Sequence, residues 1–192
     1  MATQTSGSHP SYAYVGLAGE TAPGRPVKSG LYRMVNGDGN WDLATNGLPQ
    51  NPAIRAITVH PQKPEIVYAG TQEGPYRSTD HGDHWEKVNV PGPDLPVWSL
   101  LYDPRDSNVM YTGYEACQIY RSDDGGLTWE QSDMGVQPQS TLFAVAMDSN
   151  KPSHMWCAAS GGEIWASQDS GDSWISHPLP EGASQVYSLA CG

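Results

Sequence analysis

One eight-residue pattern, Ser-x-Asp-x-Gly-x-x-Trp, recurs along this chain at nearly constant spacing. Full copies occupy residues 78–85, 122–129 and 167–174, and a worn copy occupies 34–41. Met34 and Asn36 replace Ser and Asp in the worn copy, but its last residue is still Trp. The four final tryptophans, at positions 41, 85, 129 and 174, are 44, 44 and 45 residues apart. Such a regular period indicates stacked structural repeats.

Short strands fill each period. Residues 54–90 read as four strands, 54–60, 66–71, 75–79 and 84–90, and the pattern returns in 97–131 and 141–176. The chain has 21 Gly, 16 Pro, 10 Tyr and 7 Trp but one Phe, which suits short strands joined by tight turns. Because no stretch has a sustained helical period, the sequence predicts an all-β fold, a β-propeller of four-stranded antiparallel blades.

The domain prediction follows the period. We expect a disordered tail at 1–11 and one propeller domain at 12–192, with units ending near 45, 90, 132 and 177. Another first strand is predicted at 185–191, which gives sixteen strands, or four blades' worth. That strand could pair with residues 12–15 and close a four-bladed ring. Alternatively, the chain is a fragment of a larger propeller, whose open edge would favour a homodimer.

Charge and composition exclude several classes of partner. The net charge of −11 opposes binding to nucleic acid or to an anionic membrane. No apolar run reaches the roughly 20 residues of a spanning helix, and residues 1–10 lack the features of a signal peptide. We therefore expect a cytoplasmic protein.

Cysteine and histidine give little sign of special chemistry. Cys157 and Cys191 lie in apolar, strand-like runs and are expected to be structural, whereas Cys117 is expected nearer the surface. His81 and His84 have a spacing seen in metal sites, but they lie on a turn without further ligands nearby in the sequence. No metal and no cofactor are predicted.

The repeated motif resembles the Asp-box, or BNR repeat, and with the run 66–71 the pattern is similar to the BNR/YVTN-like propellers. That family includes xyloglucan-active glycosidases, sialidases, sortilin-type receptors and a photosystem II assembly factor. The resemblance covers about residues 12–192. It implies that the boxes lie on the face opposite the active site and have a structural role. The structural box residues are Ser78, Asp80, Gly82, Trp85, Ser122, Asp124, Gly126, Trp129, Ser167, Asp169, Gly171 and Trp174.

The chemistry of the box agrees with a structural role. Its Asp follows the third strand of a blade and can accept backbone N–H bonds, which stabilises the turn. Its Gly supplies a positive φ, and its Trp opens the fourth strand and covers the turn. The box aspartates are therefore not predicted to be catalytic.

Function is expected in the loops that do not repeat, namely those joining strands two to three and four to one. These loops share one face of a propeller. They carry a mixture of carboxylate, amide, cationic and aromatic groups that suits a protein or carbohydrate ligand. The predicted binding residues are Glu20, Arg25, Arg55, Glu73, Trp98, Tyr114, Glu115 and Gln139.

Two functions remain open on this face. The first is a non-catalytic scaffold that binds protein or glycan. The second is a hydrolase of the glycosidase type, for which Glu73 and Glu115 are weak catalytic candidates because they occupy equivalent loops of successive blades. The plainer interpretation of both is that they are solvated loop acids. Sialidase chemistry is disfavoured, because Arg33, Arg77 and Arg121 share one repeat position instead of forming a triad.

Overall fold

The computed structural model describes residues 10–19, 29–132, 141–179, 186 and 189–191, and these form strands and turns. The described residues form fifteen strands in four antiparallel sheets, and each strand pairs with its neighbour in the sequence. The first sheet contains β1 (Tyr12–Leu17), β2 (Gly30–Val35) and β3 (Asp42–Leu43). The second contains β4 (Ala56–Val59), β5 (Val67–Thr71), β6 (Gly74–Ser78) and β7 (Glu86–Lys87).

The third and fourth sheets repeat the same order. The third contains β8 (Val97–Tyr102), β9 (Met110–Tyr114), β10 (Gln118–Ser122) and β11 (Glu130–Ser132). The fourth contains β12 (Leu142–Met147), β13 (Met155–Ala159), β14 (Glu163–Ser167) and β15 (Ile175–Pro178). The all-β fold of four-stranded antiparallel blades is thus confirmed. Among the described residues no helix could cross a membrane.

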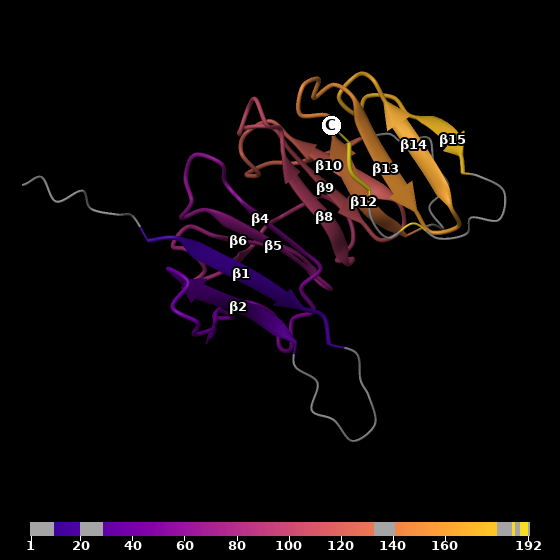
Figure 1. The fold of residues 1–192 in the computed structure, drawn as a ribbon. Coiled ribbons are helices and arrows are strands. Elements are labelled where there is room, and N and C mark those ends of the chain that lie inside the picture. The colour runs from indigo at the N-terminus through magenta and orange to yellow at the C-terminus, as the bar shows by residue number, and fades with distance from the viewer. Residues whose placement is uncertain (1–9, 20–28, 133–140, 180–185, 187–188, 192) are drawn as a thin grey trace, which may run out of the picture.

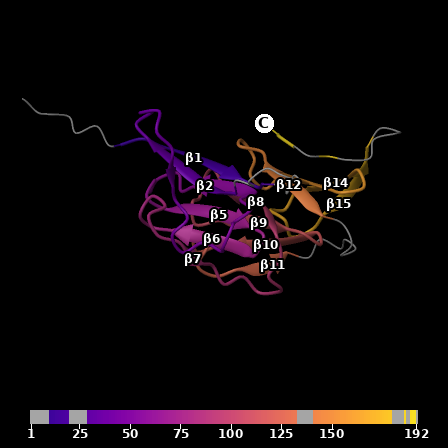
Figure 2. The ribbon, with the colours of Figure 1, turned by 90° about the horizontal axis from the view of Figure 1, so that it is seen from below.

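The four sheets follow one another in a row, with the first and fourth at opposite ends (Figure 1). The view from below shows the same order, from β1 and β2 at one end to β14 and β15 at the other (Figure 2). The first strands of successive sheets contact each other, β4 with β8 and β8 with β12. Stacking of this kind is what a repeat needs when one sheet cannot bury both of its faces alone.

The predicted strand at 185–191 is not found in the part of it that the structure describes. Val186 and residues 189–191 are in no strand, while Gln185, Tyr187 and Ser188 lie outside the described residues. The first sheet accordingly has three strands, and no fourth strand from the described residues pairs with β1. Most of the predicted tail, 1–11, lies outside the described residues, which begin at Pro10.

A repeated hydrogen bond joins neighbouring sheets. The Tyr14 hydroxyl, on β1, donates to the carbonyl oxygen of His81 at 3.0 Å. Tyr68 on β5 donates in the same way to Gly125 at 2.8 Å, and Tyr111 on β9 donates to Ser170 at 2.8 Å. Each acceptor is the residue after the Asp of the next sheet's box. The box is therefore part of the contact between sheets as well as a turn.

Within each box the Ser and Asp side chains satisfy the backbone of the turn. Ser122 Oγ accepts from the Gly126 N–H at 2.8 Å and donates to Asp124 Oδ1 at 2.8 Å. Asp124 Oδ1 also accepts from the N–H groups of Leu127 and Thr128, at 2.9 and 2.8 Å. The equivalent bonds occur around Ser78 and Asp80 and around Ser167 and Asp169.

These bonds stabilise the charged form of the aspartates. The Thr128 hydroxyl, and then backbone N–H groups, lower the pKa of Asp124 to about 2. The Ser173 hydroxyl is the main cause for Asp169, whose pKa is also about 2. The box glycines Gly82, Gly126 and Gly171 have φ values of 92°, 87° and 89°, a region that favours glycine. These carboxylates already accept hydrogen bonds from backbone N–H groups, and they stabilise the turn.

Candidate binding face

Hydrogen bonds in the second, third and fourth sheets join the loop before the first strand to the loop after the second. The Ala53 N–H donates to Gln72 Oε1 at 2.7 Å, and the Glu115 N–H donates to the Pro96 carbonyl at 2.9 Å. In the fourth sheet the Thr141 N–H donates to Ser160 Oγ at 2.9 Å. The two sets of loops therefore lie side by side on one face, which we call the loop face.

The loop face carries a stacked row of three side chains, Arg55, Trp98 and Phe143. The guanidinium carbon of Arg55 lies 4.8 Å from the Trp98 ring centroid, and Trp98 meets Phe143 edge-on at 5.0 Å between centroids. Both the cation–π contact and the edge-to-face contact are attractive because of the quadrupole of the aromatic ring. All three side chains are half-buried, so part of each remains accessible.

Repetition of the backbone explains this row. Each member follows Ile54, Val97 or Leu142, at the start of the sheet's first strand or, for Arg55, directly before it. At Trp98 and Phe143 the register with the second strand shifts, between Val97 and Ser99 and between Leu142 and Ala144. A bulge of this kind re-aims the side chain of the extra residue.

Glycines set the spacing between members of the row. A Cβ on Gly70 would lie 2.7 Å from Val97 Cγ1, and Gly16 and Gly113 face Ile54 and Leu142 in the same way. Only glycine permits so close an approach between the strand that carries it and the start of the next sheet. The row thus depends on contacts between sheets.

Trp98 has an unusual indole. Its Nε1 atom is occluded from solvent and has no hydrogen-bond partner in the described part of the chain. An unpartnered donor of this kind costs on the order of 1–3 kcal/mol.

Apart from Tyr114, the sequence-predicted binding residues divide into three groups. Arg55 and Trp98 are brought together in the stacked row. Glu73 is exposed on the loop face, where its Oε1 accepts from the Gln72 side chain at 3.4 Å, and Glu115 is half-buried beside Pro96. Three others, Glu20, Arg25 and Gln139, lie outside the described residues.

Tyr114 lies beneath the surface of this face. It is 3% exposed, and its ring meets that of Tyr120 edge-on at 5.3 Å. Burial raises the pKa of its phenol above the ordinary value. Its side chain therefore supports the loop from below.

The loop after β9 holds an unusual backbone. Ala116 and Cys117 have φ values of 64° and 54°, in the left-handed region that residues other than glycine rarely adopt. Conformations of this kind cluster at functional sites and cost on the order of 1–3 kcal/mol each.

Sequence reasoning missed Phe143. The signal was present, because Val97-Trp98-Ser99 and Leu142-Phe143-Ala144 align in the repeat. Cys117 corrects another expectation. It is 5% exposed, not near the surface, because its side chain belongs to the core cluster between the third and fourth sheets.

Histidines and acids form no metal centre in the part of the chain that is described. No group of three or more His, Cys, Asp or Glu residues there could hold a metal ion. His81 stacks on Tyr12 at 4.2 Å between ring centroids, and its Nδ1 lies 3.1 Å from the Pro64 carbonyl oxygen. Its imidazole is engaged in packing between sheets.

Comparison with known proteins finds relatives for parts of the chain. No protein-family model matches it. It is 31% identical over 86 residues to vacuolar protein sorting/targeting protein 10 of Chaetomium globosum, a match covering 44% of this chain and 6% of that protein. It is 29% identical over 116 residues to xyloglucanase Xgh74A of Acetivibrio thermocellus, covering 51% of this chain and 14% of that protein. The matches thus span a small part of these relatives.

Solved structures show the same fold. An ancestral GH74 enzyme superposes with a TM-score of 0.67 at 18% identity, over 76% of this chain and 21% of that chain. YCF48 bound to D1 peptide superposes with a TM-score of 0.59 at 15% identity, over 88% of this chain and 50% of that chain. Both likenesses concern the stacked four-stranded sheets.

Proposed function

We propose that this chain, which belongs to the Asp-box (BNR) repeat β-propeller family, acts as a non-catalytic scaffold that binds a glycan or a peptide on its loop face. Its homologues include glycoside hydrolases and binding proteins, so the family alone leaves the choice open. The choice rests on the side chains of the loop face.

The stacked row of Arg55, Trp98 and Phe143 is the observation that supports binding. Trp and Arg are the residues most enriched among energetic hot spots of interfaces. Here they are held in fixed positions by the contacts between sheets, so little side-chain entropy remains to be lost on binding. The row crosses three sheets and presents an edge of aromatic and cationic character to an extended ligand.

Two kinds of extended ligand fit this row. A glycan chain presents apolar C–H faces to aromatic rings, and the xyloglucanase relatives favour it. A peptide would bring carboxylate or carbonyl groups to Arg55, and YCF48 bound to D1 peptide shows that a propeller of this fold can hold a peptide. We place the glycan first because the sequence identity to the xyloglucanases is higher than the identity to YCF48.

A glycoside hydrolase is the alternative, and the same relatives favour it. It would need one of the two loop acids as a proton donor and the other as a base or nucleophile, roughly 5–10 Å away. Glu73, however, is exposed and engaged with its neighbour Gln72, and Glu115 is anchored in a separate hairpin. The Asp-box carboxylates are occupied by backbone N–H groups.

Calorimetric titration with xyloglucan oligosaccharides and with a panel of unstructured peptides tests the proposal. Trp98→Ala should weaken binding by at least about 30-fold, the loss expected of a hot spot worth about 2 kcal/mol. Arg55→Ala should weaken it as well. Leu127→Ala is the matched control, because Leu127 is exposed but lies in an Asp-box, away from the loop face. Unchanged affinity in Trp98→Ala would refute the assignment of the row.

Reducing-sugar release from the same oligosaccharides tests the hydrolase. Under the scaffold proposal the wild-type chain releases none. Release that is abolished by Glu73→Gln or Glu115→Gln, with binding intact, would establish the alternative instead.

A further inference from the structure

The tryptophans that end the Asp-boxes have very different surroundings at the two ends of the row of sheets. Trp85 is 1% exposed and Trp129 is 4% exposed, whereas the equivalent Trp41 in the first sheet is 44% exposed. The difference follows from stacking, because each buried Trp faces the preceding sheet. Trp85 Nε1, for example, donates to the Ala44 carbonyl of the first sheet at 3.0 Å.

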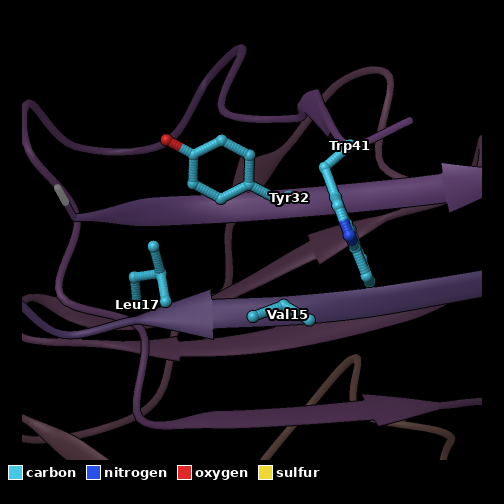
Figure 3. A pocket seen from close by; sticks show the side chains of 4 residues that line it. All are labelled: Val15, Leu17, Tyr32 and Trp41. Atoms are coloured by element: carbon cyan, nitrogen blue, oxygen red, sulfur yellow. The ribbon is translucent and has the colours of Figure 1, made fainter. Parts of the chain in front are cut away.

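Trp41 belongs to an apolar surface on the open side of the first sheet. With Val15, Leu17 and Tyr32 it lines a hollow of about 340 Å³ (Figure 3). Leu43, paired with Tyr32 across the sheet, is 61% exposed. We call these five residues the first-sheet face. Contiguous apolar surfaces of this kind mark interaction sites.

The other three sheets indicate the chemistry that covers such a face. In each of them the equivalent face receives the preceding sheet of the same repeat, and a tyrosine hydroxyl of that sheet (Tyr14, Tyr68 or Tyr111) donates to the box backbone. Arg33 also donates to the His81 carbonyl at 2.8 Å and pairs with Asp83 at 2.7 Å. The first-sheet face is therefore shaped for another sheet of this repeat.

The fourth sheet is followed by no further sheet among the described residues, and the composition of its outer face departs from the repeat. In the first three sheets, an arginine on the last strand but one lies opposite an acid on the last strand, in the pairs Arg33 and Asp42, Arg77 and Glu86, and Arg121 and Glu130. In the fourth sheet Ala166 lies opposite Ile175, and Trp156 takes the place of the tyrosine.

These changes replace the charged pair by apolar groups. They occur in the fourth sheet, which no following sheet from the described residues covers. Ile175 is 64% exposed. We call Trp156, Ile164, Ala166 and Ile175 the fourth-sheet face, in which Trp156 and Ile164 are half-buried and Ala166 is 8% exposed. The two ends of the row thus present apolar faces of opposite type, one matching a preceding sheet and one matching a following sheet.

We propose that two copies of this chain associate head to tail, with the fourth-sheet face of one copy against the first-sheet face of the other. The contact continues the stacking already present between successive sheets. It is heterologous, so one copy keeps a free first-sheet face and the other keeps a free fourth-sheet face for a further contact. If two copies instead paired symmetrically through their first-sheet faces, the fourth-sheet face of each copy would stay exposed.

Sedimentation of the full chain over about 1–100 µM tests the association, a range that covers weak and moderate dimers. We expect the average mass to rise to that of two or more copies. Trp41→Asp and Ile175→Asp should each raise the concentration needed for association by at least about 30-fold. Leu127→Asp is the control, since Leu127 is 62% exposed but lies on neither face. Circular dichroism verifies that each variant is folded.

Mixing the two variants tests the head-to-tail arrangement itself. Trp41→Asp keeps an intact fourth-sheet face and Ile175→Asp keeps an intact first-sheet face, so an equimolar mixture should form a pair of copies that neither variant forms alone. A wild-type chain that stays monomeric at about 100 µM overturns the proposal. Undiminished self-association of Ile175→Asp, or a mixture that fails to pair, also overturns it.

Discussion

The hydroxyl of Tyr68, in the second sheet, donates a 2.8 Å hydrogen bond to the carbonyl oxygen of Gly125, in the Asp-box of the third sheet. Tyr68 is fully buried, and its ring also lies under the Arg77 guanidinium at 5.9 Å. The same bond occurs from Tyr14 to His81 and from Tyr111 to Ser170. One bond per pair of neighbouring sheets thus ties the hairpin turn of a blade to the core of the preceding blade.

Tyr68→Phe should destabilise the chain by about 1–2 kcal/mol. The substitution removes the donor and leaves the Gly125 carbonyl without its partner, while the ring packing is preserved. Urea unfolding followed by tryptophan fluorescence measures the change. Tyr32→Phe is the control, because Tyr32 lies on the first-sheet face, and it should change stability by less than about 0.5 kcal/mol. Equal effects of the two substitutions would contradict the role of the bond between sheets.

Stability should fall steeply in alkaline solution. Burial raises the pKa of Tyr68 and of Tyr14 from 10.0 to about 12. Because the folded-state pKa is higher than the unfolded one, the stabilisation is complete below pH 10 and is lost as the pH rises through about 12. Urea midpoints at pH 8, 10 and 11 measure the fall. It should be shallower in Tyr68→Phe, and a midpoint independent of pH over this range would contradict the prediction.

Asp124→Ala should destabilise the third sheet's box by about 1–2 kcal/mol, since the carboxylate accepts two backbone N–H bonds and two hydroxyl bonds. The pKa of Asp124, lowered to about 2 by the Thr128 hydroxyl and backbone donors, gives this contribution an acid limit. It is present above pH 4 and is lost as the pH falls through about 2. Thermal unfolding at pH 7 and pH 3 measures both effects.

Asp172→Ala provides the comparison for the box aspartate. Asp172 is an exposed acid of the next box, and its loss should change stability by less than about 0.5 kcal/mol. If Asp124→Ala behaved like Asp172→Ala, the box carboxylate would not stabilise the turn.

Much of the fold could be predicted because the sequence repeat marks each blade. The period of the tryptophans located each blade, and the Gly and Asp of each box located the third turn of the blade. The fourth strand of the second sheet is shorter than expected, two residues at Glu86–Lys87 where 84–90 was predicted. Trp85 explains this difference, since its side chain turns to the preceding sheet and its N–H bonds to Asn46 instead of continuing a ladder with β6.

The site was harder to predict, because it depends on contacts between repeats. Arg55 and Trp98 were identified as face residues, but their stacking follows from the close approach at Gly70 and from the bulge at Val97, which periodicity does not reveal. Tyr114 looked like a loop residue but packs under the hairpin. Exposure of Trp41 could be seen only once the first sheet was found without a covering neighbour.

Gly70→Ala should destabilise the chain by about 1–3 kcal/mol, because its Cβ would lie 2.7 Å from Val97 Cγ1 and 2.9 Å from the Val97 carbonyl oxygen. Denaturant unfolding measures the loss. The natural comparison is Ala158, at the equivalent position of the fourth sheet, opposite Ala144. Ala158→Gly should cost only about 0.5–1 kcal/mol, the backbone-entropy difference. A neutral Gly70→Ala would show that the sheets can separate without penalty.

The three cysteines should differ in the reactivity of their thiols. Burial raises the pKa of Cys117 to about 11, so at pH 8 about one thiol in a thousand is ionised, and Cys157 is more deeply buried still. Cys191 is half-buried. Titration of the native chain at pH 8 with an aromatic disulfide reagent should therefore modify one cysteine promptly, and all three after unfolding in guanidinium. Cys191→Ser should remove the prompt phase, and two prompt thiols in the native wild type would contradict the burial of Cys117.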